Sequence, residues 1–432
     1  MRDALEDVLA RHRAGQGVGI TSVCSANPLV IRAACDHAVA DDAAVLIEAT
    51  SNQVDQFGGY TGMRPADFRD LVHGIAADAG LPRERVVLGG DHLGPNVWRS
   101  MPADQAMSHA EDLVREYVEA GFTKIHLDCS MACVDDQLPL TDEVVAQRAA
   151  RLARAAEEAA VRTFGRSTLQ YVIGTEVPVP GGAHEEITAL TPTSPDAAQA
   201  TVEAHRVAFA AAGIDEAWSR IAALVVQPGV EFDALRVIDY DRPRAQALSR
   251  TIEGRPLVFE AHSTDYQTTT NLAALVQDHW AILKVGPGLT FALREALFAL
   301  AAIEAEIVPA GECSRLPEVV DDVMVHRPEW WQGYYEGDET AQRVARRYSY
   351  SDRLRYYWPD PRVEAAVERL MSNLRAVPPP LPLISAHLPA QYERVRSGVL
   401  APEPTALALD HVRDVLRAYS TACTPEPSRS QS

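Results

Sequence analysis

The sequence predicts a (β/α)₈ barrel, and three observations support that prediction. Short apolar, β-branched segments alternate eight times with longer amphipathic segments, which is the pattern of a barrel built from strand and helix pairs. The short segments are apolar nearly throughout, as strands buried on both faces of a parallel sheet are. Four of the longer segments begin with proline and four are followed by glycine, which matches the residue preferences of helix starts and ends.

The eight expected strands are short and evenly distributed; they span residues 18–24, 44–48, 86–90, 124–128, 169–174, 222–227, 257–261 and 281–285. The helices expected after them span residues 28–40, 65–79, 102–120, 141–163, 195–212, 242–253, 268–278 and 290–308. An open, doubly wound sheet is the alternative fold. Its typical dinucleotide-binding G-x-G-x-x-G is missing from the first strand-to-helix turn, residues 24–28, which favours the barrel.

The barrel is expected to occupy residues 1–308, with a mostly helical extension over residues 309–423 packed on it. Tryptophan and tyrosine are frequent between residues 310 and 360, and helices are expected at residues 361–375 and about 405–419. The Ser/Pro-rich tail, residues 424–432, is expected to be disordered.

Composition excludes several classes of protein. The net charge of −20 argues against a nucleic-acid partner, because phosphate backbones attract clustered Lys and Arg. Neither a membrane-spanning segment nor a signal peptide is recognisable, since no long apolar run lacks charges. The six cysteines are scattered, and Cys129 and Cys133 have no second pair nearby to form a zinc ribbon. These features predict reduced thiols and a cytoplasmic protein.

Polar residues stand where the expected strands end, and in a barrel such side chains face one shared site. Asp91 and His92 follow two glycines, and we interpret them as an acid/base carboxylate beside a metal-binding imidazole, although backbone groups alone could satisfy both. Together with His262 and Glu176, His92 forms a set of ligands suited to a divalent metal. Gln227 is expected to add a weaker oxygen ligand, and Glu176 a second catalytic carboxylate. The remaining strand-end positions predict substrate-binding residues: Asn27, Glu48, Asp128 and Lys284.

A phosphate site is expected at the loop after the eighth strand, which in barrels often presents backbone N–H groups and a helix N-terminus to an anion. The residues expected to form it are Ser263, Gly286, Gly288 and Thr290, with Arg353 or Arg355 as a clamp from the Arg- and Tyr-rich segment 346–358. Alternatively, the loop at residues 286–290 is an ordinary turn, and the segment 346–358 only packs against the barrel. Lys284 could instead form a Schiff base if burial lowered its pKa, but the metal ligands beside it disfavour that chemistry.

The same residues carry a family resemblance over nearly the whole chain. The sequence resembles the non-catalytic subunit family of class II D-tagatose-1,6-bisphosphate aldolase, some of whose members are labelled tagatose-6-phosphate kinases. The matching stretches are residues 22–24, 46–54, 56–63, 91–96, 126–131, 174–178, 227–232, 262–265 and 348–358. The family in turn is similar to metal-dependent class II aldolases, and Asp91-His92, Glu176 and His262 follow the order of their acid/base and metal-binding residues. Gln227 stands where those enzymes have a further histidine ligand.

The resemblance implies a role in tagatose and galactitol catabolism with a divalent metal, Zn²⁺, Mn²⁺ or Mg²⁺, as cofactor. It leaves three activities open: a D-tagatose 6-phosphate/D-fructose 6-phosphate 4-epimerase working by retro-aldol cleavage, an accessory subunit that stabilises a catalytic aldolase chain, and a stand-alone aldolase. A sugar phosphate is the expected substrate, and an oligomer the expected state. The kinase label fits poorly, because the chain has neither a P-loop nor a protein-kinase signature.

Overall fold

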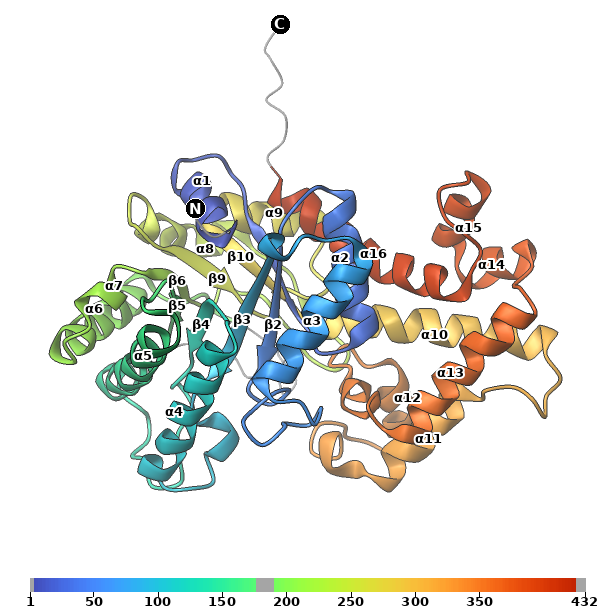
Figure 1. Ribbon diagram of the computed structural model, residues 1–432, viewed down its shortest axis with the longest axis horizontal. Helices are drawn as coiled ribbons and strands as arrows, with labels where there is room; N and C mark the ends of the chain where they lie inside the picture. The colour runs from blue at the N-terminus through green and yellow to red at the C-terminus, as the bar shows by residue number, and fades with distance from the viewer. Residues whose placement is uncertain (1–3, 176–189, 425–432) are drawn as a thin grey trace, which may run out of the picture.

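The computed structural model describes residues 4–175 and 190–424, and its centre is a closed barrel of eight parallel strands (Figure 1). Neighbouring strands pair in chain order, and the first strand pairs with the last. The barrel strands are β1 (Ile20–Cys24), β2 (Val45–Thr50), β3 (Val86–Leu93), β4 (Lys124–Leu127), β5 (Gln170–Ile173), β6 (Ile221–Val225), β9 (Val258–Ala261) and β10 (Trp280–Val285). A small antiparallel hairpin, β7 (Glu231–Phe232) and β8 (Val237–Ile238), follows β6. The predicted barrel is thus confirmed, strand by strand.

Each barrel strand is followed by a helix, and two of these helices, α2 and α3, coincide with the predicted ranges. The helices that follow the strands are α2 (Pro28–Ala40), α3 (Pro65–Ala79), α4 (Ala103–Glu119), α5 (Asp142–Phe164), α6 (Pro195–Ala211), α8 (Arg242–Ser249), α9 (Thr269–Gln277) and α10 (Pro287–Ile307). The short helices among them are α7 (Asp215–Trp218), η1 (Arg83–Arg85), η2 (Pro95–Trp98) and η3 (Arg250–Ile252). Helix α10 begins three residues before the predicted start, because Gly286 is its N-cap and Pro287 its first residue.

The N-terminal helix α1 (Ala4–Arg13) closes one end of the barrel. Its Leu5 and Leu9 are fully buried in a cluster with residues near the starts of the strands, among them Leu46, Val87 and Ile282. This end of the barrel interior is filled by apolar side chains, whereas the polar residues of the site described below lie at the opposite end, where the strands terminate.

The mostly helical extension after α10 is also confirmed. It contains α11 (Leu316–His326), η4 (Pro328–Trp330), α12 (Glu339–Tyr348), η5 (Arg353–Tyr357), α13 (Pro361–Ala376), α14 (Leu381–His387), α15 (Pro389–Arg396) and α16 (Pro404–Cys423). Helix α10 runs outward from the barrel to contact α13 and α14 (Figure 1). Helix α16 returns to the barrel and packs against α2, α9 and β1. The helical layer around the barrel therefore includes α16, between the helices that follow the first and seventh barrel strands.

Hydrogen bonds tie α16 to the barrel directly. Tyr419 donates its hydroxyl to the carbonyl oxygen of Thr264 at 2.8 Å and lies 3.0 Å from the Thr264 hydroxyl. The backbone N–H of Gly19, just before β1, donates to the carbonyl oxygen of Cys423 at 3.0 Å. The last helix is thereby fixed to the loop after β9, which carries part of the site described below.

We expect Tyr419→Phe to lower the free energy of unfolding by about 1–3 kcal/mol, because the substitution leaves a buried carbonyl without its donor. Urea denaturation of the wild type and the variant measures the difference. Tyr392→Phe is the matched control, since the Tyr392 hydroxyl contacts only the exposed Arg396, at 3.5 Å. The control should stay within about 0.5 kcal/mol of the wild type. Equal losses in both variants would contradict the role assigned to Tyr419.

Candidate active site

Asp91 and His92 lie at the end of β3, where the strand departs from regular geometry. The pairing of β3 with β4 shifts register between Gly90 and Leu93, and His92 has a φ of 50°. Non-glycine residues rarely adopt this left-handed conformation, and such irregularities redirect side chains next to active sites. Consecutive residues of a regular strand point to opposite faces, but here both side chains contact groups at the centre of the barrel.

His92 is held in place by a carboxylate behind it. Its Nδ1 lies 2.7 Å from Oδ2 of Asp128, and its Nε2 lies 3.7 Å from Oδ2 of Asp91. Burial disfavours the imidazolium, but the charges of Asp91 and Asp128 outweigh burial and raise the pKa of His92. A histidine whose one nitrogen contacts a carboxylate presents the other nitrogen to a ligand, as metal-binding histidines commonly do.

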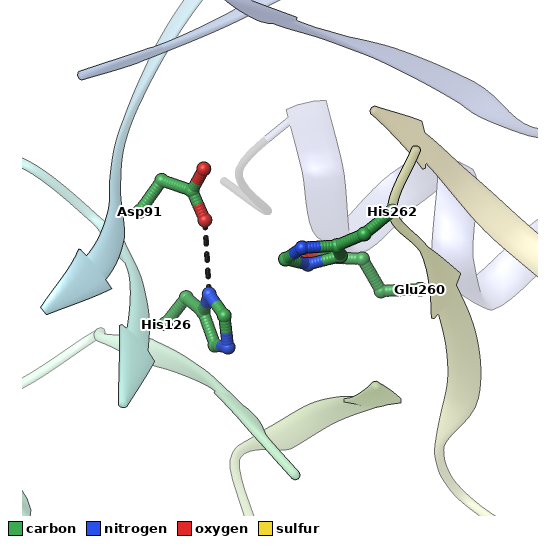
Figure 2. Close-up of side chains that lie close together, drawn as sticks. All are labelled: Asp91, His126, Glu260 and His262. Carbon is green, nitrogen blue, oxygen red and sulfur yellow. Dashed lines mark hydrogen bonds and ion pairs between the residues drawn. The ribbon is translucent and has the colours of Figure 1, made fainter. Parts of the chain in front are cut away.

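Three imidazole rings meet at the floor of the site. The ring centroids of His92, His126 and His262 are 5.0–5.1 Å apart. Asp91 and His126 approach from β3 and β4, and Glu260 and His262 approach from β9 and the loop after it (Figure 2). One potential ligand atom from each of these four residues lies within 4.8 Å of the others. We call His92, His126 and His262, with Asp91 and Glu260, the histidine cluster.

The atoms of the histidine cluster are suited to a metal ion. Burial, and then Lys284, lower the pKa of His262 to about 3, so its imidazole is neutral, as a metal ligand must be. Nε2 of His126 is buried and has no hydrogen-bond partner among the described residues. A buried polar nitrogen without a partner is costly, which indicates that a ligand belongs next to it.

Two buried lysines lie beside the cluster and are paired with carboxylates. Lys124 Nζ lies 2.7 Å from Glu48 and 2.8 Å from Glu260, and Lys284 Nζ lies 2.5 Å from Asp91. Burial opposes the charge on Lys284, but Asp91 and the other carboxylates outweigh it and hold its pKa well above the ordinary value. The amine is therefore protonated, which argues against a Schiff base at this residue.

Among the described residues, the buried charges of this site do not balance. Four carboxylates, Glu48, Asp91, Asp128 and Glu260, face two ammonium groups, Lys124 and Lys284. Buried charge without compensation is strongly disfavoured. Even with a positive charge on His92, whose pKa is raised, these groups leave a net negative charge that a bound cation would offset, and imidazole with carboxylate is a donor set that Zn²⁺ and related metals accept. The residues present thus fit the metal that the sequence predicts.

The other predicted ligand and substrate residues have different surroundings. Oε1 of Gln227 accepts hydrogen bonds from the backbone of Gly229 at 2.8 Å and Val230 at 3.0 Å, so this side chain stabilises its own loop. Asn27 caps α2 by accepting from the backbone of Leu29 at 2.9 Å, and it also lines the cleft described next. Glu176 lies outside the described residues.

A cleft with two connected parts opens above the cluster. The inner part has a volume of about 80 Å³ and is lined by Asp91, His92, His262, Ser263 and Lys284, among others. The outer part has a volume of about 310 Å³ and lies between the loops after β1 and β2 and the extension. Both parts share the residues Cys24, Gln53, Tyr60, Gly286, Pro287 and Arg355. The site is thus a covered cleft whose roof includes η5.

The predicted phosphate groups are engaged by the chain's own carboxylates. Oδ1 of Asp265 accepts hydrogen bonds from the backbone of Gly286 at 2.9 Å and of Gly288 at 2.7 Å. The hydroxyl of Thr290 donates to Asp352 at 2.6 Å. Arg353 does not line the cleft: its Nε donates to the carbonyl oxygen of Trp330 at 2.6 Å, and its guanidinium stacks on Tyr334. This placement favours Arg355, the alternative residue of the predicted clamp, which lines both parts of the cleft, as the anion-binding residue.

We expect Arg355→Ala to raise the KM for a sugar phosphate at least about tenfold and to change the KM for the free sugar much less, because a guanidinium binds phosphate through charge-assisted hydrogen bonds. Steady-state kinetics with both sugars measures the two effects. Arg353→Lys keeps the positive charge at the stacked position outside the cleft and serves as the control. Equal effects of Arg355→Ala on both sugars would remove Arg355 from the phosphate site.

The sequence prediction missed three residues of this site: Lys124, His126 and Glu260. They lie before the carboxyl ends of β4 and β9, whereas the sequence predicts site residues at those ends. A signal was present, because Lys124 and His126, like Glu260 and His262, are two residues apart in otherwise apolar segments. That spacing puts both side chains of each pair on the same face of a strand.

Fold and site together define a barrel protein whose ionisable groups gather at the carboxyl ends of the strands, where barrel enzymes carry out their chemistry. The chain belongs to the D-tagatose-1,6-bisphosphate aldolase subunit GatZ/KbaZ-like family, whose model matches residues 5–424. The resemblance seen in the sequence is therefore confirmed, and family membership supports a role in sugar-phosphate metabolism.

Solved structures extend this comparison. A protein from Sinorhizobium meliloti 1021, described as a probable tagatose 6 phosphate kinase, is 52% identical to this chain, with a TM-score of 0.86. The match covers 94% of this chain and 100% of that one. A putative fructose-1,6-biphosphate aldolase from Coccidioides immitis and the YdjI aldolase from Escherichia coli K12 are each 14% identical over 87% of this chain and 96% of theirs, with TM-scores of 0.40 and 0.43. Within the described residues, no helix is long and apolar enough to span a membrane.

Proposed function

We propose that this protein is a metal-dependent ketohexose-6-phosphate 4-epimerase that interconverts D-tagatose 6-phosphate and D-fructose 6-phosphate by retro-aldol and aldol chemistry. One observation supports this proposal above the others. The carboxylate of Asp91 faces the inner part of the cleft, beside the three imidazoles and in contact with the protonated Lys284. An acid/base group and a metal-binding set thus share one cleft.

The proposed metal site consists of His92, His126 and His262, with Asp91 or Glu260 as a further ligand and Glu176 as the sequence predicts. A bound Zn²⁺, Mn²⁺ or Mg²⁺ supplies Lewis acidity to the carbonyl and hydroxyl oxygens of the sugar and stabilises the negative charge that develops there. Asp128 fixes the ring of His92, and Glu260 contacts Nε2 of His262 at 2.9 Å. These two carboxylates would orient the imidazoles.

Asp91 is proposed to move the proton. Burial opposes ionisation of this carboxyl, but His92 and Lys284 outweigh it and hold the pKa of Asp91 well below its ordinary value. The carboxylate can therefore accept the proton of the C4 hydroxyl as the C3–C4 bond breaks and its electrons pass to C3. The products of this step are glyceraldehyde 3-phosphate and the enediolate of dihydroxyacetone. After the aldehyde turns its other face, the bond re-forms and Asp91 returns the proton to the C4 oxygen.

The phosphate of the substrate is proposed to lie in the outer part of the cleft, at Arg355. After cleavage this phosphate belongs to the aldehyde fragment. A fixed phosphate keeps that fragment in the cleft while the carbonyl rotates. The roof formed by η5 would also limit the escape of both fragments and exclude water from the enediolate.

The test is incubation of the purified protein with D-tagatose 6-phosphate and Mn²⁺, Zn²⁺ or Mg²⁺ in D₂O, followed by NMR. We expect D-fructose 6-phosphate without deuterium at C4, because the C4 hydrogen never leaves its carbon, and a trace of glyceraldehyde 3-phosphate. Deuterium at C4 would contradict retro-aldol cleavage. Stoichiometric triose without epimer would instead favour the stand-alone aldolase.

An accessory role in a two-chain aldolase is the second candidate. The family description names an aldolase subunit, and Gln227, where the related aldolases have a histidine ligand, is engaged with its own loop. Absence of epimerisation with every metal, together with a rise in the thermal stability of a catalytic aldolase chain on mixing, would favour this candidate.

A further inference from the structure

The N-terminus of α10 already holds an anion that belongs to the chain. Oδ1 of Asp265 accepts from the backbone N–H groups of Gly286 and Gly288, at 2.9 and 2.7 Å. In many barrels this loop and helix N-terminus bind a substrate phosphate through the same type of backbone group. A Cβ added to Gly288 would lie 3.1 Å from that oxygen, so the carboxylate and the turn are closely packed.

We call the N-terminal turn of α10, with Gly286, Gly288 and Thr290, the phosphate cradle. Its third polar group, the hydroxyl of Thr290, is also occupied by a carboxylate of the chain. The Thr290 hydroxyl donates to Asp352, and Asp352 in turn contacts Nε of the buried Arg294 at 3.2 Å. Burial raises the pKa of Asp265 to about 6, although its backbone hydrogen bonds act in the opposite direction, so at neutral pH the group is mostly ionised. A phosphate placed here would meet a buried carboxylate where it needs N–H donors.

Positive charge is available to a ligand elsewhere in the cleft. Among the described residues that line its two parts, the lysine and arginine side chains are Lys284 and Arg355. Lys284 is paired with Asp91, whereas Arg355 uses three of its N–H donors on the oxygens of Ser351, Asp352 and Tyr356. A guanidinium has five N–H donors, so two remain for one anionic group.

We propose that Asp265 is a specificity residue: it fills the phosphate cradle of α10, so that the cleft accepts a ketose with one anionic end, held at Arg355, and rejects a ketose bisphosphate. This inference rests on the proposed function in taking a ketose phosphate as the ligand, and it adds which phosphorylation pattern the site selects. A second phosphate placed at α10 would lie beside the negative carboxylate of Asp265, and the backbone N–H groups there are already occupied. The repulsion would therefore weaken binding without any compensating contact, and a site can discriminate against a ligand in this way.

Isothermal titration calorimetry of the Mn²⁺-loaded protein with D-fructose 6-phosphate and D-fructose 1,6-bisphosphate tests the proposal. We expect the wild type to bind the monophosphate at least about tenfold more tightly than the bisphosphate. Asp265→Ser, which empties the cradle, should bind the bisphosphate at least about tenfold more tightly than the wild type does and leave the affinity for the monophosphate unchanged. Asp265→Asn, which removes the charge but keeps an acceptor oxygen and the volume, should gain less.

Asp233→Ser is the matched control. Oδ1 of Asp233 likewise accepts two backbone N–H groups, of Leu235 at 2.7 Å and Arg236 at 2.8 Å, but Asp233 does not line the cleft. Its affinities should equal those of the wild type. If Asp265→Ser fails to fold, Asp265→Asn carries the test, and an unchanged affinity for the bisphosphate then overturns the proposal.

The outcomes separate this inference from the proposed function. Selective binding of the monophosphate without turnover would refute the epimerase and leave the role of Asp265 intact. Turnover of the monophosphate with equally tight binding of the bisphosphate would refute the role of Asp265 and leave the epimerase intact. A wild type that binds neither sugar phosphate would overturn the inference.

Discussion

Replacing Asp91 with asparagine should lower kcat for epimerisation by at least about 10²–10⁴-fold, the range that a general acid/base typically supplies. The side chain keeps its size and can still hydrogen bond, but it can no longer accept the C4 hydroxyl proton. We expect the variant to keep its metal, because the three imidazoles remain, and to bind the sugar phosphate nearly as well as the wild type. NMR-monitored turnover, metal analysis and calorimetry measure these three properties.

Asp128→Asn provides the comparison, since Asp128 is a buried carboxylate that contacts His92 rather than the cleft. Loss of a carboxylate that orients a metal-binding histidine typically costs about 10–100-fold in metal affinity or activity. Asp128→Asn should therefore weaken metal binding, and excess metal should restore much of its turnover. If excess metal also restores turnover in Asp91→Asn, Asp91 acts on the metal and not on the proton.

Replacing His92 with alanine should remove both the metal and the activity. Nδ1 of His92 is held by Asp128, so Nε2 is the atom left for ligation, and alanine offers no substitute. We expect substoichiometric metal by elemental analysis and no detectable epimerisation, whereas the wild type should gain thermal stability on addition of metal because binding to the folded state stabilises it.

His205→Ala is the control for this loss. His205 is also buried, and Nδ1 contacts the carbonyl oxygen of Thr201 on α6, away from the cleft. Burial lowers its pKa to about 4, so it too is a neutral buried imidazole. The control should lose some stability and keep its metal and activity. Full metal content in His92→Ala would show that the ion is held by ligands other than His92.

The barrel could be predicted because its signals are local. Apolar runs, initial prolines and terminal glycines each act within a few residues, and the strands and helices follow them closely. The location of α16 could not be predicted in this way. Its sequence specifies an amphipathic helix, but nothing local to residues 404–423 indicates that it packs between α2 and α9.

The candidate site, like the fold, could be predicted only where the signal is local in the sequence. Asp91, His92 and His262 stand at strand ends and could be predicted, and the structure brings them together, whereas His126 lies inside β4 and could not be predicted in this way. The phosphate loop illustrates a second limit. The glycines have the right type and spacing, but whether their N–H groups are free depends on Asp265, which lies about 20 residues earlier in the chain, at the end of the neighbouring strand.

Helix α16 also has a consequence for the order in which the protein assembles during synthesis. The helical layer around β1 is completed by residues that follow every strand of the barrel, and Gly19 bonds to the carbonyl oxygen of Cys423. Chains emerge from the ribosome N-terminal part first. Until Pro404–Cys423 has been made, the apolar surfaces of α2 and α9 that α16 covers stay open to solvent and to chaperones. A nascent chain stalled after α10 would therefore expose the surfaces of α2, α9 and β1 that α16 contacts in the complete fold.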